Sequence, residues 1–399
     1  RCLDDVSPPR QWKNCHPLVA SVGVSDSSTH VRLNMSEPIL PAYLPPAIPG
    51  RGSPINPPNR FERLHVSCDA DTWQTDLDGV PDERLDPRTH FFHDATESIL
   101  TRNDSPDIPF TYGLNAYRGC EHGCAYCYAR PFHEYLGWSA GLDFETKILV
   151  KLRAPELLRR ELDSPKWRPE VVSMSGVTDC YQPAERHFRL TRACLEVFAE
   201  FRNPVGIVTK NFLVTRDRDL LAELARWKCA VVYVTITTLD ADLAGKLEPR
   251  AARPEHRLRA IRLLADAGVP VGVMTAPIIP GLTEHELPAI LDAAAKAGAR
   301  RAGYVVLRLP HAVKEIFSHW LDVHAPSKKA RVLDRVRELR GGQLNVSDWG
   351  ARMRGEGIFA EQIHDLFAVA VRRAGLNREP GEISTEHFRR PGGVQMDLF

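Results

Sequence analysis

From about residue 108 to about residue 310, the chain alternates between short apolar runs and longer stretches with helical spacing. The apolar runs, rich in Val and Ile, predict strands at 111–115, 171–175, 204–209, 230–236, 270–275 and 302–307. The intervening stretches predict helices near 127–136, 154–163, 187–202, 217–227, 254–267 and 284–297. Alternation of this kind predicts an α/β fold with a parallel sheet covered by helices, either a doubly wound open sheet or an open barrel of β/α units.

The regions on either side of residues 106–310 differ in character. Residues 1–105 contain a Pro-rich stretch and polar, turn-rich sequence, so we expect an extended N-terminal arm. The chain begins with Arg1 and its first methionine is Met35, so residues 1–34 are interpreted as an upstream extension. Residues 311–376 predict a small helical extension, with helices at Val313 to Val323, Lys328 to Arg340 and Phe359 to Ala374. Residues 377–399 are mostly polar with Pro and Gly, which predicts a disordered tail.

Composition narrows the class of protein. The net charge of +1 gives no global attraction for nucleic acid, so any such contact would come from a local patch. No apolar run reaches membrane-spanning length. Nine cysteines in 399 residues do not make a disulfide scaffold, and an odd count with one tight cluster favours a reducing compartment. These features predict a soluble cytoplasmic protein without a membrane partner.

The tight cluster consists of Cys120, Cys124 and Cys127, with glycines at positions 119 and 123. Three thiolates can bind three irons of a [4Fe–4S] cube and leave the fourth iron open to a ligand that is not protein. Zinc is one alternative, but it usually takes four ligands, and His122 is too close in sequence to Cys120 and Cys124 to complete a tetrahedron easily. Unrelated buried cysteines are the other alternative. The spacing favours the cluster.

The Cys-x-x-x-Cys-x-x-Cys spacing resembles the signature of the radical SAM superfamily. The resemblance implies a partial (β/α)6 radical SAM barrel, with S-adenosyl-L-methionine bound at the open iron and cleaved reductively to a 5′-deoxyadenosyl radical. It also implies that the barrel strands bind this cofactor at their C-terminal ends. The residues expected there are Ser175 and Gly176 after the second strand, Thr209 and Lys210 after the third, and Ile278 and Ile279 after the fifth.

A closer resemblance covers roughly residues 50 to 375. It is carried by Arg118-Gly119-Cys120-Glu121-His122-Gly123-Cys124, Thr178-Asp179-Cys180-Tyr181-Gln182-Pro183-Ala184-Glu185 and Lys246-Leu247-Glu248-Pro249. These motifs are similar to those of bacterial radical SAM proteins grouped with the spore photoproduct lyases as DNA repair photolyase-like proteins. The resemblance implies a lyase-like DNA repair enzyme acting on DNA or a nucleobase-derived substrate, with an electron donor such as flavodoxin or ferredoxin.

In the lyase, the cysteine that returns a hydrogen atom to the substrate stands just before a Thr-Ser-Asp triplet. Here the triplet is Val177-Thr178-Asp179 and the residue before it is Gly176, so that donor is missing. Cys180 follows the triplet and is one candidate donor, with packing as a small apolar residue as the alternative. Tyr128, next to Cys127, is a second candidate, with a ring packed on the cluster loop as the alternative.

The final residues, Gln395-Met396-Asp397-Leu398-Phe399, resemble the peptide that bacterial replication and repair proteins insert into the sliding clamp. In this interpretation Leu398 and Phe399 enter a hydrophobic pocket and Gln395 hydrogen-bonds at its rim. The alternative is a tail that folds back onto its own barrel. For the chain as a whole, the competing function is a non-catalytic iron–sulfur protein that senses redox state or recruits a partner.

Overall fold

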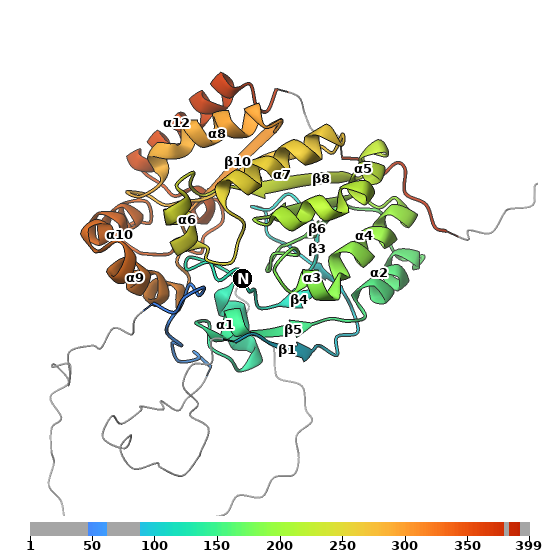
Figure 1. Ribbon diagram of the computed structural model, residues 1–399, viewed down its shortest axis with the longest axis horizontal. Helices are drawn as coiled ribbons and strands as arrows, with labels where there is room; N and C mark the ends of the chain where they lie inside the picture. The colour runs from blue at the N-terminus through green and yellow to red at the C-terminus, as the bar shows by residue number, and fades with distance from the viewer. Residues whose placement is uncertain (1–46, 62–87, 379–382, 392–399) are drawn as a thin grey trace, which may run out of the picture. The chain divides into compact units, whose positions relative to one another are not determined.

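The computed structural model describes residues 47–61, 88–378 and 383–391, which all lie in one compact unit (Figure 1). Its centre is a seven-stranded sheet in the order β10-β9-β8-β7-β6-β3-β2. The strands are β2 (Leu100–Arg102), β3 (Tyr112–Leu114), β6 (Val172–Met174), β7 (Val205–Thr209), β8 (Ala230–Thr235), β9 (Val271–Ile278) and β10 (Arg301–Val306). All neighbouring pairs are parallel except β2 and β3. Strands β10 and β2 are the two edges, so the barrel stays open.

The six parallel strands coincide with the six predicted from the apolar runs, and the predicted partial barrel is confirmed. Their apolar side chains form one core with the inner faces of the helices. The register pairs Leu114 with Met174 and Met174 with Ile207, so the C-terminal ends of β3, β6 and β7 lie beside one another. Residues that follow these strands are therefore brought to one edge of the sheet.

Helices cover the outside of the sheet because each presents one apolar face (Figure 1). In α2 (Ala154–Asp163), for example, Leu157, Leu158 and Leu162 are buried while Arg159 and Arg160 are exposed. The other main covering helices are α4 (Leu190–Phe201), α5 (Arg218–Arg226), α7 (Pro254–Asp266) and α8 (Leu287–Lys296). Shorter helices lie in the connections: η2 (Arg130–Leu136), α1 (Asp143–Thr146), α3 (Glu185–Phe188), η3 (Phe212–Asp217), α6 (Ala241–Leu247) and η4 (Glu284–Glu286).

A second, three-stranded sheet in the order β1-β5-β4 corrects the prediction that residues 1–105 form only an extended arm. Strand β1 (His90–His93) pairs in parallel with β5 (Lys147–Val150), which pairs antiparallel with β4 (Tyr117–Arg118). Strand β2 also falls within the predicted arm. These strands are short and mostly exposed, so they lack the buried apolar run by which a strand is recognised in a sequence.

The C-terminal helices are α9 (Val313–His324), η5 (Pro326–Lys328), α10 (Lys329–Glu338), α11 (Ala351–Arg354) and α12 (Ile358–Ala374), and α12 packs against α8 (Figure 1). Of these helices, α9, α10 and α12 match the three predicted segments, and η5 and α11 were not predicted. No helix in the described part of the chain is long and apolar enough to span a membrane.

The prediction of a disordered tail from residue 377 is wrong for residues 383–391, which lie against the barrel. The backbone N–H of Arg389 donates to the carbonyl of Phe201 at 2.9 Å, and that of Ser384 donates to Lys228 at 2.8 Å. The ring of Phe388 packs on Phe201 with 6.3 Å between ring centres. One aromatic side chain and a few backbone hydrogen bonds are enough to order a segment whose composition is otherwise polar.

Candidate functional site

The cysteine loop lies between β4 and η2, directly after the first barrel strands. Cys120 and Cys124 are 7% and 8% exposed, and Cys127 is partly exposed. Burial raises the pKa of the Cys124 thiol well above its usual value, with the Glu248 carboxylate and the Cys127 thiol adding to the effect. Burial also raises the pKa of Cys127, and Cys120 adds to that increase. The thiols of Cys120, Cys124 and Cys127 thus lie near one another.

The loop's backbone is tightly packed against residues that come from the N-terminal arm. Gly123 has φ +65°, and a Cβ atom there would lie 2.6 Å from an Oε atom of Glu145. Gly52 lies so close that its own Cβ would be 1.6 Å from the Gly123 carbonyl oxygen. Only glycine fits at these two positions, which explains their presence.

Buried Glu145 and Arg130 form an ion pair that connects the arm to the loop. The Glu145 carboxylate accepts hydrogen bonds from the backbone N–H groups of Gly52 at 3.0 Å and Ser53 at 2.9 Å. Arg130 donates through Nε to the Cys124 carbonyl at 3.0 Å. The ion pair therefore fixes the backbone of one predicted ligand directly.

A second buried ion pair, between Glu248 and Arg257, supports the loop from the barrel side. Tyr126, which lies between Cys124 and Cys127 in the sequence, donates a hydrogen bond from its hydroxyl to the Glu248 carboxylate. The Ala125 N–H donates to the Leu247 carbonyl at 3.0 Å. Burial alone would raise the pKa of Glu248, but the charges of Arg257 and Lys210, together with hydrogen bonds from Arg257 and Tyr126, outweigh it and lower the pKa to about 2.

Asp179, after β6, makes the third connection. Its Oδ2 lies 3.3 Å from Nδ1 of His122 and accepts the Lys210 N–H at 2.8 Å, while its Oδ1 accepts the Thr209 hydroxyl at 2.8 Å. Burial would lower the pKa of His122, but the charge and hydrogen bond of the Asp179 carboxylate, with a smaller contribution from Cys120, outweigh that effect and raise the pKa to about 9. The imidazole therefore keeps a hydrogen on Nδ1 for Asp179 at neutral pH.

The donor set fits a [4Fe–4S] cube. Three thiols come from one loop whose backbone is fixed from three sides, and the positive-φ glycine at position 123 gives it a tight turn. Among the described residues, no group of three His, Cys, Asp or Glu side chains converges as the ligands of a single ion would. The three cysteine thiolates that hold a cube each bind a different iron, so they need not converge on one point. Cys120, Cys124 and Cys127 are the residues that would hold it.

The structure brings the predicted S-adenosylmethionine residues to the same edge of the sheet as the loop. Ser175 has φ +115°, unusual for a residue with a side chain, and the Gly176 carbonyl accepts the Tyr128 hydroxyl at 2.8 Å. The Lys210 ammonium nitrogen lies 5.9 Å from the centre of the Tyr126 ring. The end of β6 and the end of β7 thus both border the cysteine loop.

Three of the other predicted cofactor residues are already covered by protein. Thr209 is 1% exposed and its hydroxyl is engaged by Asp179. Ile278 and Ile279 are 3% and 0% exposed, and Ile279 packs in the same apolar cluster as Cys124 and Tyr126. A ligand beside the end of β9 would chiefly meet backbone there.

The two candidate hydrogen donors differ in access. Cys180 is 3% exposed and Tyr128 is 44% exposed. The Ser175 hydroxyl donates to the Cys180 sulfur at 3.2 Å, and burial raises the pKa of this thiol well above its usual value. The Tyr128 ring has the Arg308 guanidinium 5.0 Å from its centre. Both side chains thus border the end of β6.

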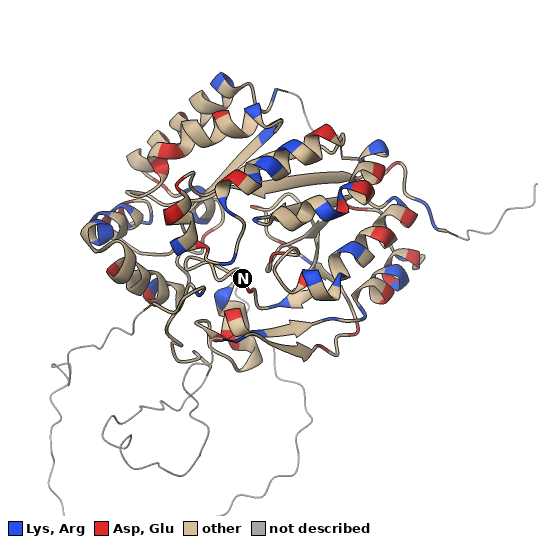
Figure 2. Cartoon of the chain, in the orientation of Figure 1, with Lys and Arg blue, Asp and Glu red and all other residues tan. Residues whose placement is uncertain are grey.

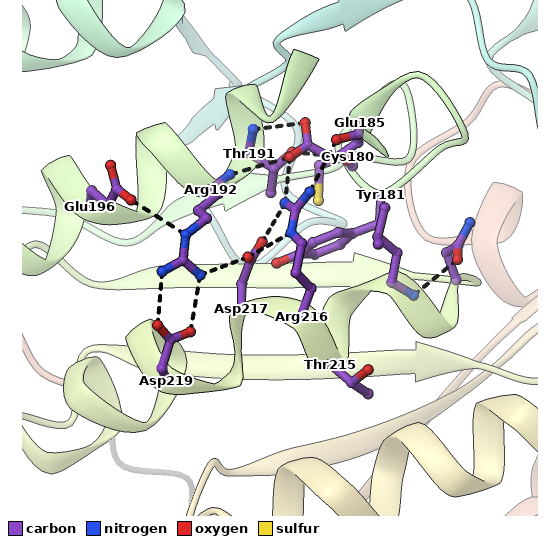
Figure 3. Close-up of polar contacts among 12 residues, drawn as sticks. Cys180, Tyr181, Glu185, Thr191, Arg192, Glu196, Thr215, Arg216, Asp217 and Asp219 are labelled. Atoms are coloured by element: carbon purple, nitrogen blue, oxygen red, sulfur yellow. Dashed lines mark hydrogen bonds and ion pairs between the residues drawn. The ribbon is translucent and has the colours of Figure 1, made fainter. Parts of the chain in front are cut away.

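Figure 3 shows the polar network that holds the backbone at Cys180. The Thr191 hydroxyl donates to the Cys180 carbonyl at 2.5 Å, and the Thr191 N–H donates to Glu185 at 2.9 Å. Arg216 pairs with both Glu185 and Asp217, at 2.6 Å each. This network lies beside the site and supports the backbone at Cys180. None of its charged groups is among the residues expected to bind the cluster or S-adenosylmethionine.

Sequence reasoning missed the supporting residues: His122, Arg130, Glu145, Asp179, Glu248 and Arg257. Several of them fall within the motifs that carry the family resemblance, but the motifs assigned them no structural role. The available signal was a charged residue placed among apolar or glycine neighbours, which needs a partner once buried.

Comparisons with known proteins agree with this geometry. The sequence pattern described as "Radical SAM superfamily" matches residues 114–294. The uncharacterized protein Rv2578c of Mycobacterium tuberculosis is 37% identical over 298 residues, covering 73% of this chain and 83% of that protein. The uncharacterized protein MJ0683 of Methanocaldococcus jannaschii is 32% identical over 178 residues, covering 44% of this chain and 63% of that protein.

Among solved structures, spore photoproduct lyase complexed with dinucleoside spore photoproduct is similar, with a TM-score of 0.52 and 15% identity. The similarity covers 72% of this chain and 80% of the lyase. A variant of the lyase with bound AdoMet and dinucleoside spore photoproduct gives a TM-score of 0.51 with the same coverage. At this identity the likeness establishes the fold.

Proposed function

We propose, from the premise that this chain belongs to the radical SAM superfamily, that it acts on a nucleic-acid or nucleobase-derived substrate. Membership makes it a radical SAM enzyme whose cofactors are a [4Fe–4S] cluster and S-adenosyl-L-methionine. When bound, these cofactors supply a 5′-deoxyadenosyl radical by reductive cleavage. The placement of three thiols in one loop beside the ends of β6 and β7 supports this set of cofactors.

The substrate class rests on two supports. The fold is that of spore photoproduct lyase, whose structure contains a dinucleoside photoproduct. In addition, the exposed face of Tyr128 beside Gly176 offers an aromatic surface on which a base can stack. We propose a lyase-like repair reaction on this basis.

We propose that Tyr128 or Cys180 returns a hydrogen atom to the substrate radical. Transfer of a hydrogen atom requires an intact O–H or S–H bond. A tyrosine hydroxyl, with an ordinary pKa of about 10, keeps that hydrogen at neutral pH, and burial raises the pKa of the Cys180 thiol further above its usual value. The greater exposure of Tyr128 favours it, because a donor has to reach the substrate.

The test of the substrate class is 5′-deoxyadenosine formation by the reduced enzyme with candidate substrates. Undamaged and ultraviolet-damaged oligonucleotides, damaged RNA and free nucleosides are compared, with deuterium transfer into deoxyadenosine as a second readout. Stimulation by the damaged oligonucleotide supports repair. A cluster-loaded protein that never forms 5′-deoxyadenosine, with or without these substrates, would instead be the non-catalytic iron–sulfur protein.

A sliding clamp is a second proposed partner, through Gln395, Leu398 and Phe399, which lie outside the described residues. A peptide of roughly the last ten residues is expected to bind purified clamp at about micromolar affinity, as short segments that order on binding do. Replacing Leu398 and Phe399 by alanine should abolish binding. No binding by the wild-type peptide at high micromolar clamp would remove this partner.

A further inference from the structure

Two adjoining hollows lie beside the cysteine loop. The first, of about 360 Å³, lies between α3, the start of η3 and α7, and the second is about 460 Å³. They share Arg186 and Arg250 and together form one surface, which we call the arginine surface. Its members are Arg51, Arg88, Thr89, Phe91, Glu121, Pro183, Arg186, His187, Asn211, Phe212, Arg250, Ala251, Ala252, His256 and Arg259.

Among the described residues, the arginine surface is lined by five arginines and one carboxylate, Glu121, and its positive character rests on Arg186 and Arg259. That carboxylate is 3% exposed and pairs with Arg250 at 3.0 Å. Arg186 and Arg259 are exposed and have no carboxylate partner in the described part of the chain; Arg259 only stacks on Phe212, 5.6 Å from its ring centre. Arginines recur along α7, where they are blue in Figure 2.

The floor of the arginine surface is the cysteine loop itself. Glu121 directly follows Cys120. The backbone N–H of Arg250 donates to the backbone carbonyl of His122 at 3.3 Å, and Asn211 Nδ2 lies 3.0 Å from His122 Nε2. A partner seated here would be separated from the predicted cluster by residues 121 and 122.

The residues proposed to bind S-adenosylmethionine do not line this surface. Neither hollow includes Ser175, Gly176, Thr209, Lys210, Ile278 or Ile279, and neither includes Tyr128 or Cys180. A substrate must meet the radical formed from S-adenosylmethionine, so it must approach those residues. A partner on the arginine surface instead reaches the loop without meeting them, which suits one that delivers an electron and nothing else.

We propose that the arginine surface is the docking site of an acidic one-electron carrier protein that reduces the cluster. The inference rests on the proposed function, since reductive cleavage of S-adenosylmethionine takes one electron from the reduced cluster. The carrier is oxidised by one electron and the cluster is reduced by one, and no proton or heavy atom moves. Complexes between electron-transfer proteins bury small interfaces and bind weakly, and opposite charges guide the encounter of the two proteins. A compact positive surface is suited to a complex of this kind with an acidic partner.

The test compares the Arg186→Glu/Arg259→Glu double variant with wild type and with Arg373→Glu, an exposed residue of α12 outside the surface. Affinity for a purified acidic flavodoxin is measured by anaerobic titration calorimetry on the cluster-loaded protein at low and high salt. We expect at least about tenfold weaker binding for the double variant, with a weaker salt dependence, and no change for Arg373→Glu. The milder Arg186→Gln/Arg259→Gln should lie between. Binding of flavodoxin unaffected by charge reversal would overturn the inference.

Activity separates this inference from the proposed function. With dithionite, which needs no docking, the double variant should form 5′-deoxyadenosine as wild type does, whereas with reduced flavodoxin it should be slower. If wild type forms none with dithionite, the proposed function fails while the calorimetric result still decides the docking site. If charge reversal weakens binding of a DNA duplex and leaves flavodoxin binding intact, the surface serves nucleic acid and the inference is wrong.

Discussion

Oδ2 of Asp179 lies 3.3 Å from Nδ1 of His122, so the segment after the second barrel strand is joined to the middle of the cysteine loop. The same carboxylate accepts from the Thr209 hydroxyl and the Lys210 N–H. A single side chain thus couples β6, β7 and the loop. The position of the predicted cluster relative to the strand ends depends on it.

Asp179→Ala should therefore weaken both the fold and the cluster site. Removing the carboxylate leaves buried donors on His122 and Thr209 without an acceptor, which costs about 1–3 kcal/mol of the free energy of unfolding. Urea unfolding and iron content after anaerobic reconstitution measure the two effects. Asp219→Ala is the control, because the Asp219 side chain is 59% exposed and its pair with Arg192 adds little. Normal iron content in Asp179→Ala would show that the loop does not need this connection.

Arg257→Leu should be among the most destabilising single changes. It leaves the Glu248 carboxylate buried and unpaired, which typically costs about 3–5 kcal/mol. Adding Glu248→Gln to Arg257→Leu removes the uncompensated charge and keeps an acceptor for Tyr126, so part of the stability should return. Equal stability of the single and double variants in urea would contradict this account of the ion pair.

How far the sequence predicts the fold depends on burial. The runs that became β6 to β10 are apolar and mostly buried, so alternation alone located them. Strands β1 and β4 pair with β5 from distant parts of the chain, and nothing local in His90–His93 indicates a partner at Lys147–Val150. Pairing at such a distance is decided by tertiary contacts, which a single sequence does not display.

For the site, the cysteine spacing predicted the loop, but not what holds it. Glu145 and Arg130 are separated by fifteen positions, and Glu248 lies more than a hundred positions from Tyr126. Their partners become visible only when the barrel closes around the loop. Thr209 was predicted to face the cofactor because it ends a strand, whereas its hydroxyl is engaged by Asp179.

His133 predicts a pH dependence of stability. Burial lowers the pKa of this imidazole from 6.5 to about 4, and its Nε2 has no hydrogen-bond partner among the described residues. The folded state therefore binds the proton more weakly than the unfolded state. The free energy of unfolding should fall as the pH drops from 6.5 towards 4, by about 3 kcal/mol in total, and should not depend on His133 above that window.

The measurement is urea unfolding between pH 7 and about pH 5, above the range where carboxylates dominate. His133→Phe, which keeps a ring between Trp138 and Phe144, should flatten the dependence. His285→Gln changes an exposed histidine and should leave it unchanged. An equally steep decline in His133→Phe would assign the dependence to other groups.

Tyr128→Phe and Cys180→Ala should separate the two proposed hydrogen donors. The true donor's variant should still form 5′-deoxyadenosine but should release misprocessed product, because the substrate radical is no longer quenched in the site. Product analysis by mass spectrometry with deuterated solvent reports this. Since Tyr128 is the more exposed, we expect the larger change in Tyr128→Phe. Unchanged products in both variants would exclude both residues.

The central claim is that Cys120, Cys124 and Cys127 hold a [4Fe–4S] cluster that cleaves S-adenosylmethionine. The most direct measurement is 5′-deoxyadenosine formed by anaerobically reconstituted, dithionite-reduced protein, together with iron content and the cluster's visible absorbance. Wild type and Cys194→Ala, which alters a buried cysteine of α4, should bind iron and form deoxyadenosine, and Cys124→Ala should lose both. Wild-type protein that holds a full cluster yet forms no deoxyadenosine, or Cys124→Ala protein that retains full activity, would contradict the account.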